Sequence, residues 1–91
     1  MTTQHKNITV SGMVQGVGFR YACLKMARTT GINGFVKNLP NGKVYIEAEG
    51  NESQLKVFIR WCYSGPSHAY VQSVNIVDGE TVCYNNFDIK P

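Results

Sequence analysis

The chain has 91 residues, of which 43% are hydrophobic and 16% charged, and a formal net charge of +3. This composition excludes a disordered chain, which would be poorer in apolar residues, and no stretch approaches the ~20 apolar residues needed to span a membrane. Since there is neither a signal-peptide core nor a basic run, we expect one cytoplasmic domain over residues 1–91, with residues 1–5 frayed.

The first predicted strand covers residues 6–14. Its apolar side chains at Ile8, Val10 and Val14 alternate with polar ones, which is the period-two pattern of a half-buried strand. The following segment breaks this alternation, because Gly16 and Gly18 favour the unusual backbone angles of a loop. A loop is therefore expected directly after the first strand.

A helix is predicted over residues 19–30. Apolar side chains recur there at spacings of three and four, as on one buried helical face, and Gly31 provides a stop. The residues of this face are Phe19, Ala22, Cys23, Met26 and Ala27.

An antiparallel hairpin is predicted next. Residues 32–39 form its first strand, and Pro40-Asn41-Gly42 contains the Asn-Gly pair typical of tight turns. The second strand, at about residues 44–49, alternates apolar residues on one face with Glu47 and Glu49 on the other. We expect these two carboxylates to be solvated, because their face points away from the predicted helices.

A second helix is predicted from Asn51, which forms a capping-box pattern with Gln54. The buried stripe of this helix consists of Leu55, Phe58, Ile59 and Cys62. The helix is expected to end before Gly65-Pro66, since proline cannot continue it.

Two strands complete the predicted elements, at residues 69–77 and 84–89, with a turn at Asp78-Gly79 between them. The resulting order predicts an α+β fold, the ferredoxin-like βαββαβ sandwich. In this fold two helices cover one face of an antiparallel sheet of four main strands, to which the short last strand adds a fifth.

The loop over residues 16–20 has the features of an anion site. It connects a buried strand to a helix, so that several backbone N–H groups lie unpaired at the positive end of the helix dipole. Gly16 and Gly18 leave the backbone open to a phosphate, and Arg20 adds a guanidinium that can bind two phosphate oxygens. The alternative is a glycine-rich connection with a solvated arginine. Neither a Walker A loop nor a dinucleotide-binding loop fits the spacing.

Two segments resemble the signatures of the acylphosphatases, in the order found in that family. They are GMVQGVGFR at residues 12–20 and GFVKN at residues 34–38, the latter followed by Gly42, Val44 and Gly50. The resemblance extends more loosely to the last strand and implies a small single-domain protein of bacterial type with the same ferredoxin-like fold. It also implies hydrolysis of acyl phosphates to a carboxylate and inorganic phosphate, without a metal or other cofactor.

The same resemblance implies the roles of particular residues. Arg20 would bind the substrate phosphoryl group together with the backbone amides of Gln15, Gly16, Val17, Gly18, Phe19 and Arg20. Asn38 would orient the attacking water, although an Asn before a Pro-Asn-Gly turn often bonds to its own hairpin. A carboxylate leaving group, with a conjugate-acid pKa of about 4, needs no general acid. Because neither motif offers a strong base, we expect the proton of the water to go to the substrate phosphate.

The other reactive side chains are expected to have no chemical role. His5, in the frayed terminus, and His68, beside the Gly-Pro loop, lack partners at metal-ligand spacing and are predicted to be surface residues. Cys23 and Cys62 are predicted to be buried, neutral thiols, whereas Cys83 lies in a loop and should be exposed.

RNA recognition and phosphate binding with little turnover are the two alternative functions. The segment FVKNLP, residues 35–40, looks like the first ribonucleoprotein motif of an RNA-recognition domain, but it lies on the second strand and lacks the stacking aromatics and basic strip. A phosphate-binding module with little turnover is disfavoured because both Arg20 and Asn38 are present. We expect a monomer that acts on a small-molecule acyl phosphate, releases inorganic phosphate, and binds neither nucleic acid nor a membrane.

Overall fold

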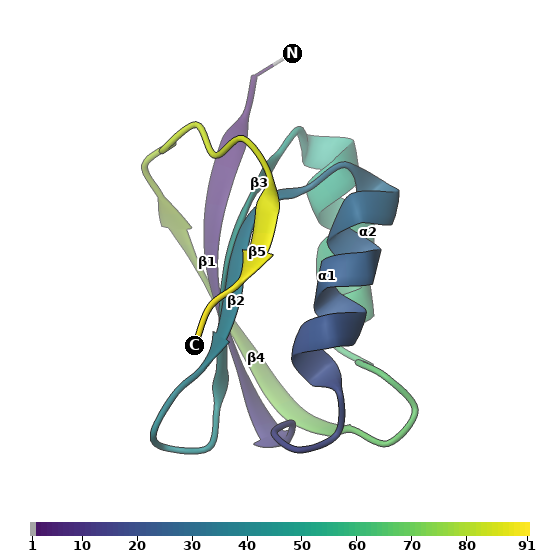
Figure 1. Cartoon of the computed structure of the whole chain (residues 1–91). Coiled ribbons are helices and arrows are strands. Elements are labelled where there is room, and N and C mark those ends of the chain that lie inside the picture. The colour runs from purple at the N-terminus through teal and green to yellow at the C-terminus, as the bar shows by residue number, and fades with distance from the viewer. Residues whose placement is uncertain (1) are drawn as a thin grey trace.

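The computed structural model describes residues 2–91 and contains two helices that lie on one face of a five-stranded sheet (Figure 1). The elements in chain order are β1 (Gln4–Met13), α1 (Phe19–Thr30), β2 (Asn33–Asn38), β3 (Val44–Gly50), α2 (Glu52–Cys62), β4 (Tyr70–Gly79) and β5 (Phe87–Ile89). This arrangement confirms the predicted α+β ferredoxin-like fold. Over residues 2–91, neither helix is long and apolar enough to cross a membrane.

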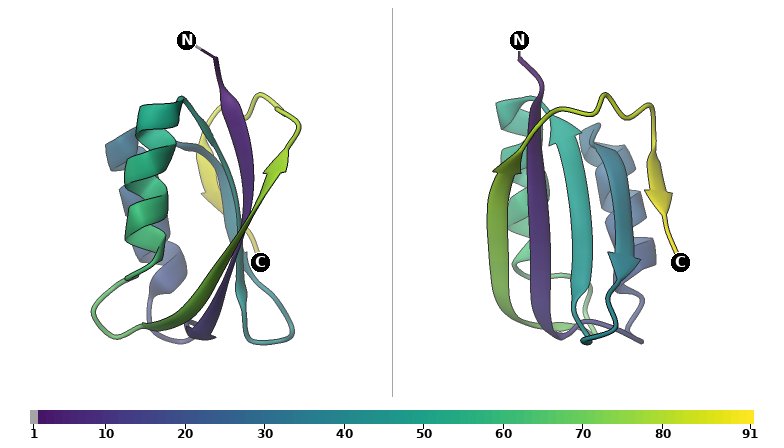
Figure 2. Two further views of the ribbon diagram at one scale, coloured as in Figure 1. Left: turned by 180° about the vertical axis from the view of Figure 1, so that it is seen from behind. Right: turned by 90° about the vertical axis from the view of Figure 1, so that its left-hand side faces the viewer.

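The strands lie in the order β4-β1-β3-β2-β5, as the right-hand view of Figure 2 shows. β1 pairs antiparallel with both β3 and β4, and β2 pairs antiparallel with β3. β5 pairs parallel with β2, placing Ile89 opposite Val36. The four main strands are therefore antiparallel as predicted, and the short fifth strand makes the sheet mixed.

Both helices begin and end where the local sequence indicates. On α1, the backbone N–H of Gly31 donates to the carbonyl of Ala27 and closes the last turn. At the start of α2 the predicted capping box is present, with Gln54 N donating to Asn51 Oδ1 at 2.8 Å and Asn51 N donating to Gln54 Oε1 at 2.9 Å. These local bonds satisfy backbone groups that would otherwise be unpaired at the helix ends.

The hydrophobic core lies between the helices and the sheet. It combines alternate residues of β1 and β3 with one face of each helix, and it includes Ile8, Val10, Val44, Ile46, Ala48, Phe19, Cys23, Ala27, Leu55, Phe58 and Cys62. The predicted burial of Cys23 and Cys62 is confirmed, and Cys83 is exposed as expected. Burial raises the pKa of Cys23 well above its ordinary value and that of Cys62 to about 12, so both thiols stay neutral and unreactive.

The predicted turn at Asp78-Gly79 is wrong, since β4 continues through both residues. Gly79 pairs with His5 and Asp78 with Lys6 of β1, and the Lys6 ammonium also contacts the Asp78 carboxylate. The last strand, β5, covers only residues 87–89, while residues 80–86 form a loop across the upper end of the sheet (Figure 1). Cross-strand pairing with β1 therefore prevailed over the local turn preference of Asp-Gly.

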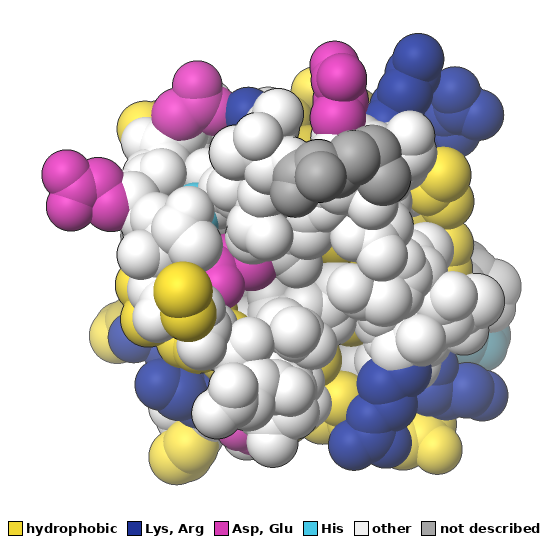
Figure 3. All heavy atoms as spheres, turned by 90° about the horizontal axis from the view of Figure 1, so that it is seen from above, with side chains coloured by type: hydrophobic (Ala, Val, Ile, Leu, Met, Phe, Trp, Pro, Cys, Tyr) yellow, Lys and Arg dark blue, Asp and Glu magenta, His cyan; other side chains and the backbone are white. Residues whose placement is uncertain are grey.

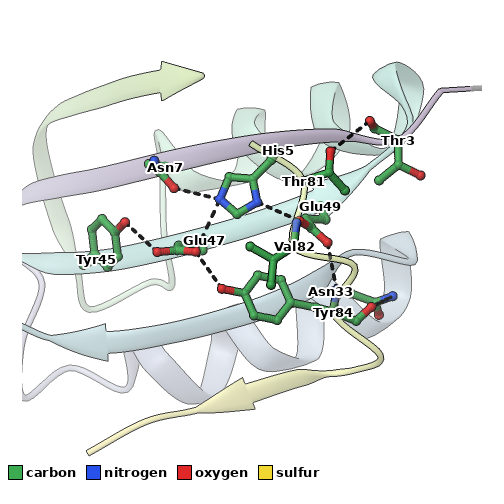
Figure 4. A network of polar contacts seen from close by, with 10 residues as sticks. All are labelled: Thr3, His5, Asn7, Asn33, Tyr45, Glu47, Glu49, Thr81, Val82 and Tyr84. Carbon is green, nitrogen blue, oxygen red and sulfur yellow. Dashed lines mark hydrogen bonds and ion pairs between the residues drawn. The ribbon is translucent and has the colours of Figure 1, made fainter. Parts of the chain in front are cut away.

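The prediction of a frayed N-terminus is wrong at Gln4 and His5, because β1 begins at Gln4 and His5 is only 5% exposed. Met1 lies outside the described residues. His5 Nδ1 donates to Glu49 Oε2 at 2.7 Å, and His5 Nε2 lies 2.8 Å from Asn7 Oδ1 and 3.3 Å from Glu47 Oε1 (Figure 4). We refer to His5, Asn7, Glu47, Glu49 and Tyr84 as the His5 cluster.

The prediction of two solvated carboxylates on β3 is also wrong. Glu49 is 3% exposed and accepts hydrogen bonds from the backbone N–H groups of Val82 and Tyr84. Glu47 is half-buried and accepts from the hydroxyls of Tyr45, at 2.8 Å, and Tyr84, at 2.7 Å. The loop at residues 80–86 covers this part of the outward sheet face, and it is held there by these carboxylates (Figure 4).

Charge and burial act in opposite directions in the His5 cluster. Burial lowers the pKa of His5, but hydrogen bonds to Glu49 and Asn7 and the charges of Glu47 and Glu49 outweigh it, so the His5 pKa is raised. Burial raises the pKa of Glu49, but its bonds from His5, Val82 and Tyr84 leave that pKa below its ordinary value. The pair is thus favoured in its charged form. Figure 3, which views this end, shows acidic side chains in a hollow surrounded mainly by uncharged atoms.

Candidate active site

The loop between β1 and α1 has a backbone that opens toward solvent. Gly16 and Gly18 have φ angles of 76° and 78°, in the left-handed region that favours glycine. Among the described residues, nothing lies within 4 Å of the position a Cβ would take at either glycine. Both glycines thus give the loop its shape and keep side chains away from its open surface.

The N-terminus of α1 lies at the end of this loop. Gly18 is its N-cap residue, and within residues 2–91 no side chain caps it and no acidic residue occupies the first turn. Backbone N–H groups at the start of a helix carry partial positive charge and bind anions when they have no intramolecular partner. The beginning of α1 therefore retains the anion-binding character expected from the sequence.

A cavity of about 240 Å³ lies beside the loop. It is lined by residues from the loop, from the first turn of α1 and from the ends of β2 and β5, namely Val14, Gly16, Gly18, Phe19, Arg20, Tyr21, Asn38 and Ile89. The cavity thus brings together four predicted loop residues and the predicted water-positioning residue Asn38. Residues from two separate sequence motifs meet in it.

Asn38 is the last residue of β2, where it pairs with Val44 of β3. The alternative role for its side chain, a bond within its own turn, is filled by another residue. Asn41 Oδ1 accepts the backbone N–H of Lys43 at 3.1 Å, and Leu39 N donates to the Lys43 carbonyl at 2.8 Å. The hairpin is therefore closed by Asn41 and the backbone, while Asn38 lines the cavity.

Two of the predicted loop residues have side chains that do not line this cavity. Gln15 Nε2 donates to the carbonyl oxygens of Leu39 at 2.8 Å and Lys43 at 2.9 Å. Val17 is half-buried and packs against the hydrophobic core. Only their backbone N–H groups are left to contribute to an anion site.

Three residues of the cavity were not identified from the sequence as site residues. Val14 was predicted only as an apolar residue of the first strand. Tyr21 follows Arg20 on the exposed side of α1, where its ring lies 5.7 Å from Lys25 Nζ. Ile89 reaches the cavity because β5 pairs with β2, and the Lys90 N–H donates to the Val36 carbonyl at 2.9 Å. Tyr21 could have been identified from the sequence, because it directly follows the loop motif. Ile89 could not, because local patterning does not reveal the parallel pairing of its strand with β2.

Comparison with protein families supports the reading of the two motifs. The acylphosphatase family model matches residues 6–89 of the chain. An acylphosphatase of Archaeoglobus fulgidus is 49% identical over 82 residues, which are 90% of this chain and 92% of that protein.

Comparison with solved structures gives the same family. The crystal structure of acylphosphatase from Bacillus subtilis superimposes with a TM-score of 0.94 at 32% identity, covering 97% of this chain and 99% of that one. An acylphosphatase from Coxiella burnetii has a TM-score of 0.93 at 34% identity, covering 97% and 93% of the two chains.

Proposed function

The chain belongs to the acylphosphatase family, hydrolases that act on acid anhydrides, and we propose that residues 15–20 and Asn38 form its hydrolytic site. The observation that supports this proposal most is the cavity in which Arg20, the two loop glycines and Asn38 meet. Groups suited to binding an anion and an amide suited to holding a water molecule line this one cavity. The substrate is an acyl phosphate, a mixed anhydride of a carboxylic acid and phosphoric acid.

In the proposed site the loop binds the phosphoryl group. Its oxygens accept hydrogen bonds from backbone N–H groups of residues 15–20, at the positive end of the α1 dipole. The Arg20 guanidinium adds two charge-assisted hydrogen bonds, and its fixed charge stabilises the negative charge on the equatorial oxygens during transfer. The absence of side chains at Gly16 and Gly18 lets the phosphoryl group approach the backbone closely.

The water is held by the amide of Asn38 in this proposal. The side-chain oxygen accepts a hydrogen bond from water and leaves a water lone pair directed at phosphorus. The new bond forms between the water oxygen and phosphorus, while the bond between phosphorus and the acyl oxygen breaks. The carboxylate leaves with that electron pair, and the proton of water passes to a phosphate oxygen, giving inorganic phosphate and a carboxylate.

This division of roles needs few residues because the leaving group is good. A carboxylate with a conjugate-acid pKa of about 4 departs at neutral pH without protonation. The protein therefore has to supply position and electrostatic stabilisation, which Arg20, the loop amides and Asn38 provide. No step in the proposal requires a metal or other cofactor.

We further propose one domain over the whole chain that acts as a cytoplasmic monomer on small acyl phosphates. Large exposed apolar side chains lie on several elements, among them Val57 on α2, Val77 on β4 and Val82 in the loop at residues 80–86. Small exposed groups such as Met13 and Tyr70, which pair across β1 and β4, are normal for a monomeric protein. Recognition of nucleic acid or of a membrane is not part of the proposal.

The proposal is tested with acetyl phosphate and benzoyl phosphate as substrates. We expect the wild-type chain to release phosphate from both, and Arg20→Ala and Asn38→Ala to lose most but not all of this activity. Arg28→Ala is the matched control, because Arg28 is an exposed arginine in the last turn of the same helix. If both site variants retain wild-type rates, or if the wild type does not exceed the uncatalysed rate, the proposed site is wrong.

A further inference from the structure

The side chain of Gln15 joins the loop to the hairpin that carries Asn38. Gln15 Nε2 has two hydrogens, and it lies 2.8 Å from the Leu39 carbonyl oxygen and 2.9 Å from that of Lys43. Both donors of the amide are therefore directed at backbone acceptors of the turn between β2 and β3. Gln15 directly precedes Gly16 of the loop, and Leu39 directly follows Asn38.

The turn does not need Gln15 for its own closure. The Leu39 carbonyl already accepts the Gly42 N–H at 3.2 Å, and the Lys43 carbonyl accepts the Leu39 N–H at 2.8 Å. Asn41 adds a side-chain bond to the Lys43 N–H at 3.1 Å. The two bonds from Gln15 are additional, and what they add is a connection between two segments that are distant in sequence.

A connection at this place matters because the bonds that close the turn lie within the turn and do not reach the loop. The loop contains two glycines with open space around them, and the hairpin turn at residues 40–42 is exposed. In-line attack requires the water and the phosphoryl group to be aligned within about 0.5 Å and 10–20°. Asn38 and the loop amides can maintain such alignment only if the distance between their segments is fixed.

We propose that Gln15 is a positioning residue that fixes Asn38 relative to the loop amides. This inference rests on the proposed function, because it assigns to Gln15 an effect exerted through Asn38. The Gln15 side chain itself contacts neither the phosphoryl group nor the water. Its loss leaves the loop able to bind phosphate, while the water is held in a broader range of positions.

The test replaces Gln15 by methionine, which keeps the unbranched shape of the side chain and removes both donors. For acetyl phosphate we expect Gln15→Met to lower kcat by about 10- to 100-fold, the effect of a displacement near 1 Å. The inhibition constant of inorganic phosphate should change by less than about threefold, because loop binding does not involve the Gln15 side chain. Gln15→Asn, which keeps the donors but is shorter by one methylene, should give a smaller loss of kcat.

The matched control is Asn41→Ala, which removes a hydrogen bond of the same turn but leaves the connection to the loop intact. If Gln15 acted only by stabilising the hairpin, Asn41→Ala would lower kcat as Gln15→Met does. We expect it to keep kcat within about twofold of wild type, since backbone bonds still close the turn. Thermal unfolding of each variant establishes that the assayed protein is folded, and Gln15→Asn provides the kinetic test if Gln15→Met does not fold.

A double mutant separates this inference from the proposed function. In an Asn38→Ala background, Gln15→Met should lower kcat by less than about twofold, because the group it positions is gone. Equal effects of Gln15→Met in both backgrounds, an unchanged kcat in the single variant, or a parallel loss of phosphate affinity would each overturn the role assigned to Gln15. A fully active Asn38→Ala would instead refute the proposed function, whatever the result at Gln15.

Discussion

The two ends of the sheet hold polar groups in opposite ways. At the end crossed by the loop at residues 80–86, which is the upper end in Figure 1, polar groups are paired. His5 and Glu49 are 5% and 3% exposed there, and their polar atoms bond to one another and to backbone N–H groups of this loop. At the lower end, the start of α1 and Asn38 line a cavity instead. Polar groups paired within the protein contribute to its stability, whereas those left open to a cavity remain available to a ligand.

The two ends are connected through the C-terminal segment. Glu49 holds Val82 and Tyr84, and the chain continues from there into β5, which pairs with β2 and brings Ile89 to the cavity. The His5 cluster therefore holds the loop that leads into β5, whereas β5 itself is held at the cavity by its pairing with β2. Changes at the lower end should affect turnover, and changes at the upper end should affect stability.

The largest expected effect is that of Arg20→Ala on the lower end. Loss of the guanidinium should lower kcat/KM for acetyl phosphate by about 1,000-fold or more, as for removal of a charge that stabilises a phosphoryl transition state. The free energy of unfolding should change by less than about 0.5 kcal/mol, because Arg20 is half-exposed and outside the core. Steady-state kinetics and urea unfolding of the same preparation check both halves of this prediction.

Glu49→Ala should have the next largest effect, which we expect on stability rather than on turnover. It leaves His5 and two backbone N–H groups without their acceptor, which should cost about 3 kcal/mol in the free energy of unfolding. The kcat of the folded variant should stay within about threefold of wild type, because Glu49 lies at the opposite end of the sheet. The control for urea unfolding is Glu80→Ala, which removes an exposed carboxylate from the loop at residues 80–86.

The His5–Glu49 pair should make the stability of the fold depend on pH. Because the pKa of His5 is raised, its contribution to the free energy of unfolding is full below the unfolded pKa of about 6.5 and is lost as pH rises through the folded pKa. The lowered pKa of Glu49 means that its contribution is present above an unfolded pKa of about 4.3 and is lost as pH falls through its folded pKa. The cluster should therefore stabilise the fold most between these two unfolded values.

Urea unfolding of wild type and His5→Gln from pH 5 to pH 9 measures this contribution. The free energy of unfolding of the wild type should exceed that of the variant most at mildly acidic pH. This difference should shrink as pH rises through the folded pKa of His5. A difference that grows with pH would contradict the charged form of the pair. The pH profile of kcat should be the same in both proteins, because His5 does not act in the proposed chemistry.

The smallest expected effect concerns the acyl end of the substrate. Tyr21 and Ile89 are 63% and 38% exposed and line the cavity beside the proposed phosphoryl site. Tyr21→Ala and Ile89→Ala should raise KM for benzoyl phosphate by about fivefold and leave KM for acetyl phosphate within about twofold, since an acetyl group offers little apolar surface to bury. Tyr63→Ala, which removes an exposed tyrosine after α2, is the control.

Most of the fold could be predicted from the sequence because its core follows local periodicity. Ile8 and Val10 alternate along β1, and Phe19, Cys23 and Ala27 recur along α1, so burial on one face is readable from spacing. Asn51 and Gln54 predicted the start of α2 for a similar local reason. Arg20 and Asn38 were predicted as site residues from their motifs, and both line one cavity in the structure.

What could not be predicted depends on contacts between distant segments. His5 and Glu49 lie on the outward face of the sheet, and they are buried only because the loop at residues 80–86 crosses it. The cavity wall at Ile89 and the bonds of Gln15 to the hairpin likewise depend on which segments become neighbours after folding. No periodicity in the sequence encodes such neighbours.

In the proposed site Asn38 and the loop have separate roles, one for water and one for the phosphoryl group. The most direct test of these separate roles is the effect of Asn38→Ala on kcat for acetyl phosphate and on the inhibition constant of inorganic phosphate, measured with one preparation. We expect a kcat lowered by about 1,000-fold and a phosphate inhibition constant within about threefold of wild type. A kcat within tenfold of wild type, or a phosphate affinity lost in proportion to kcat, would contradict these separate roles.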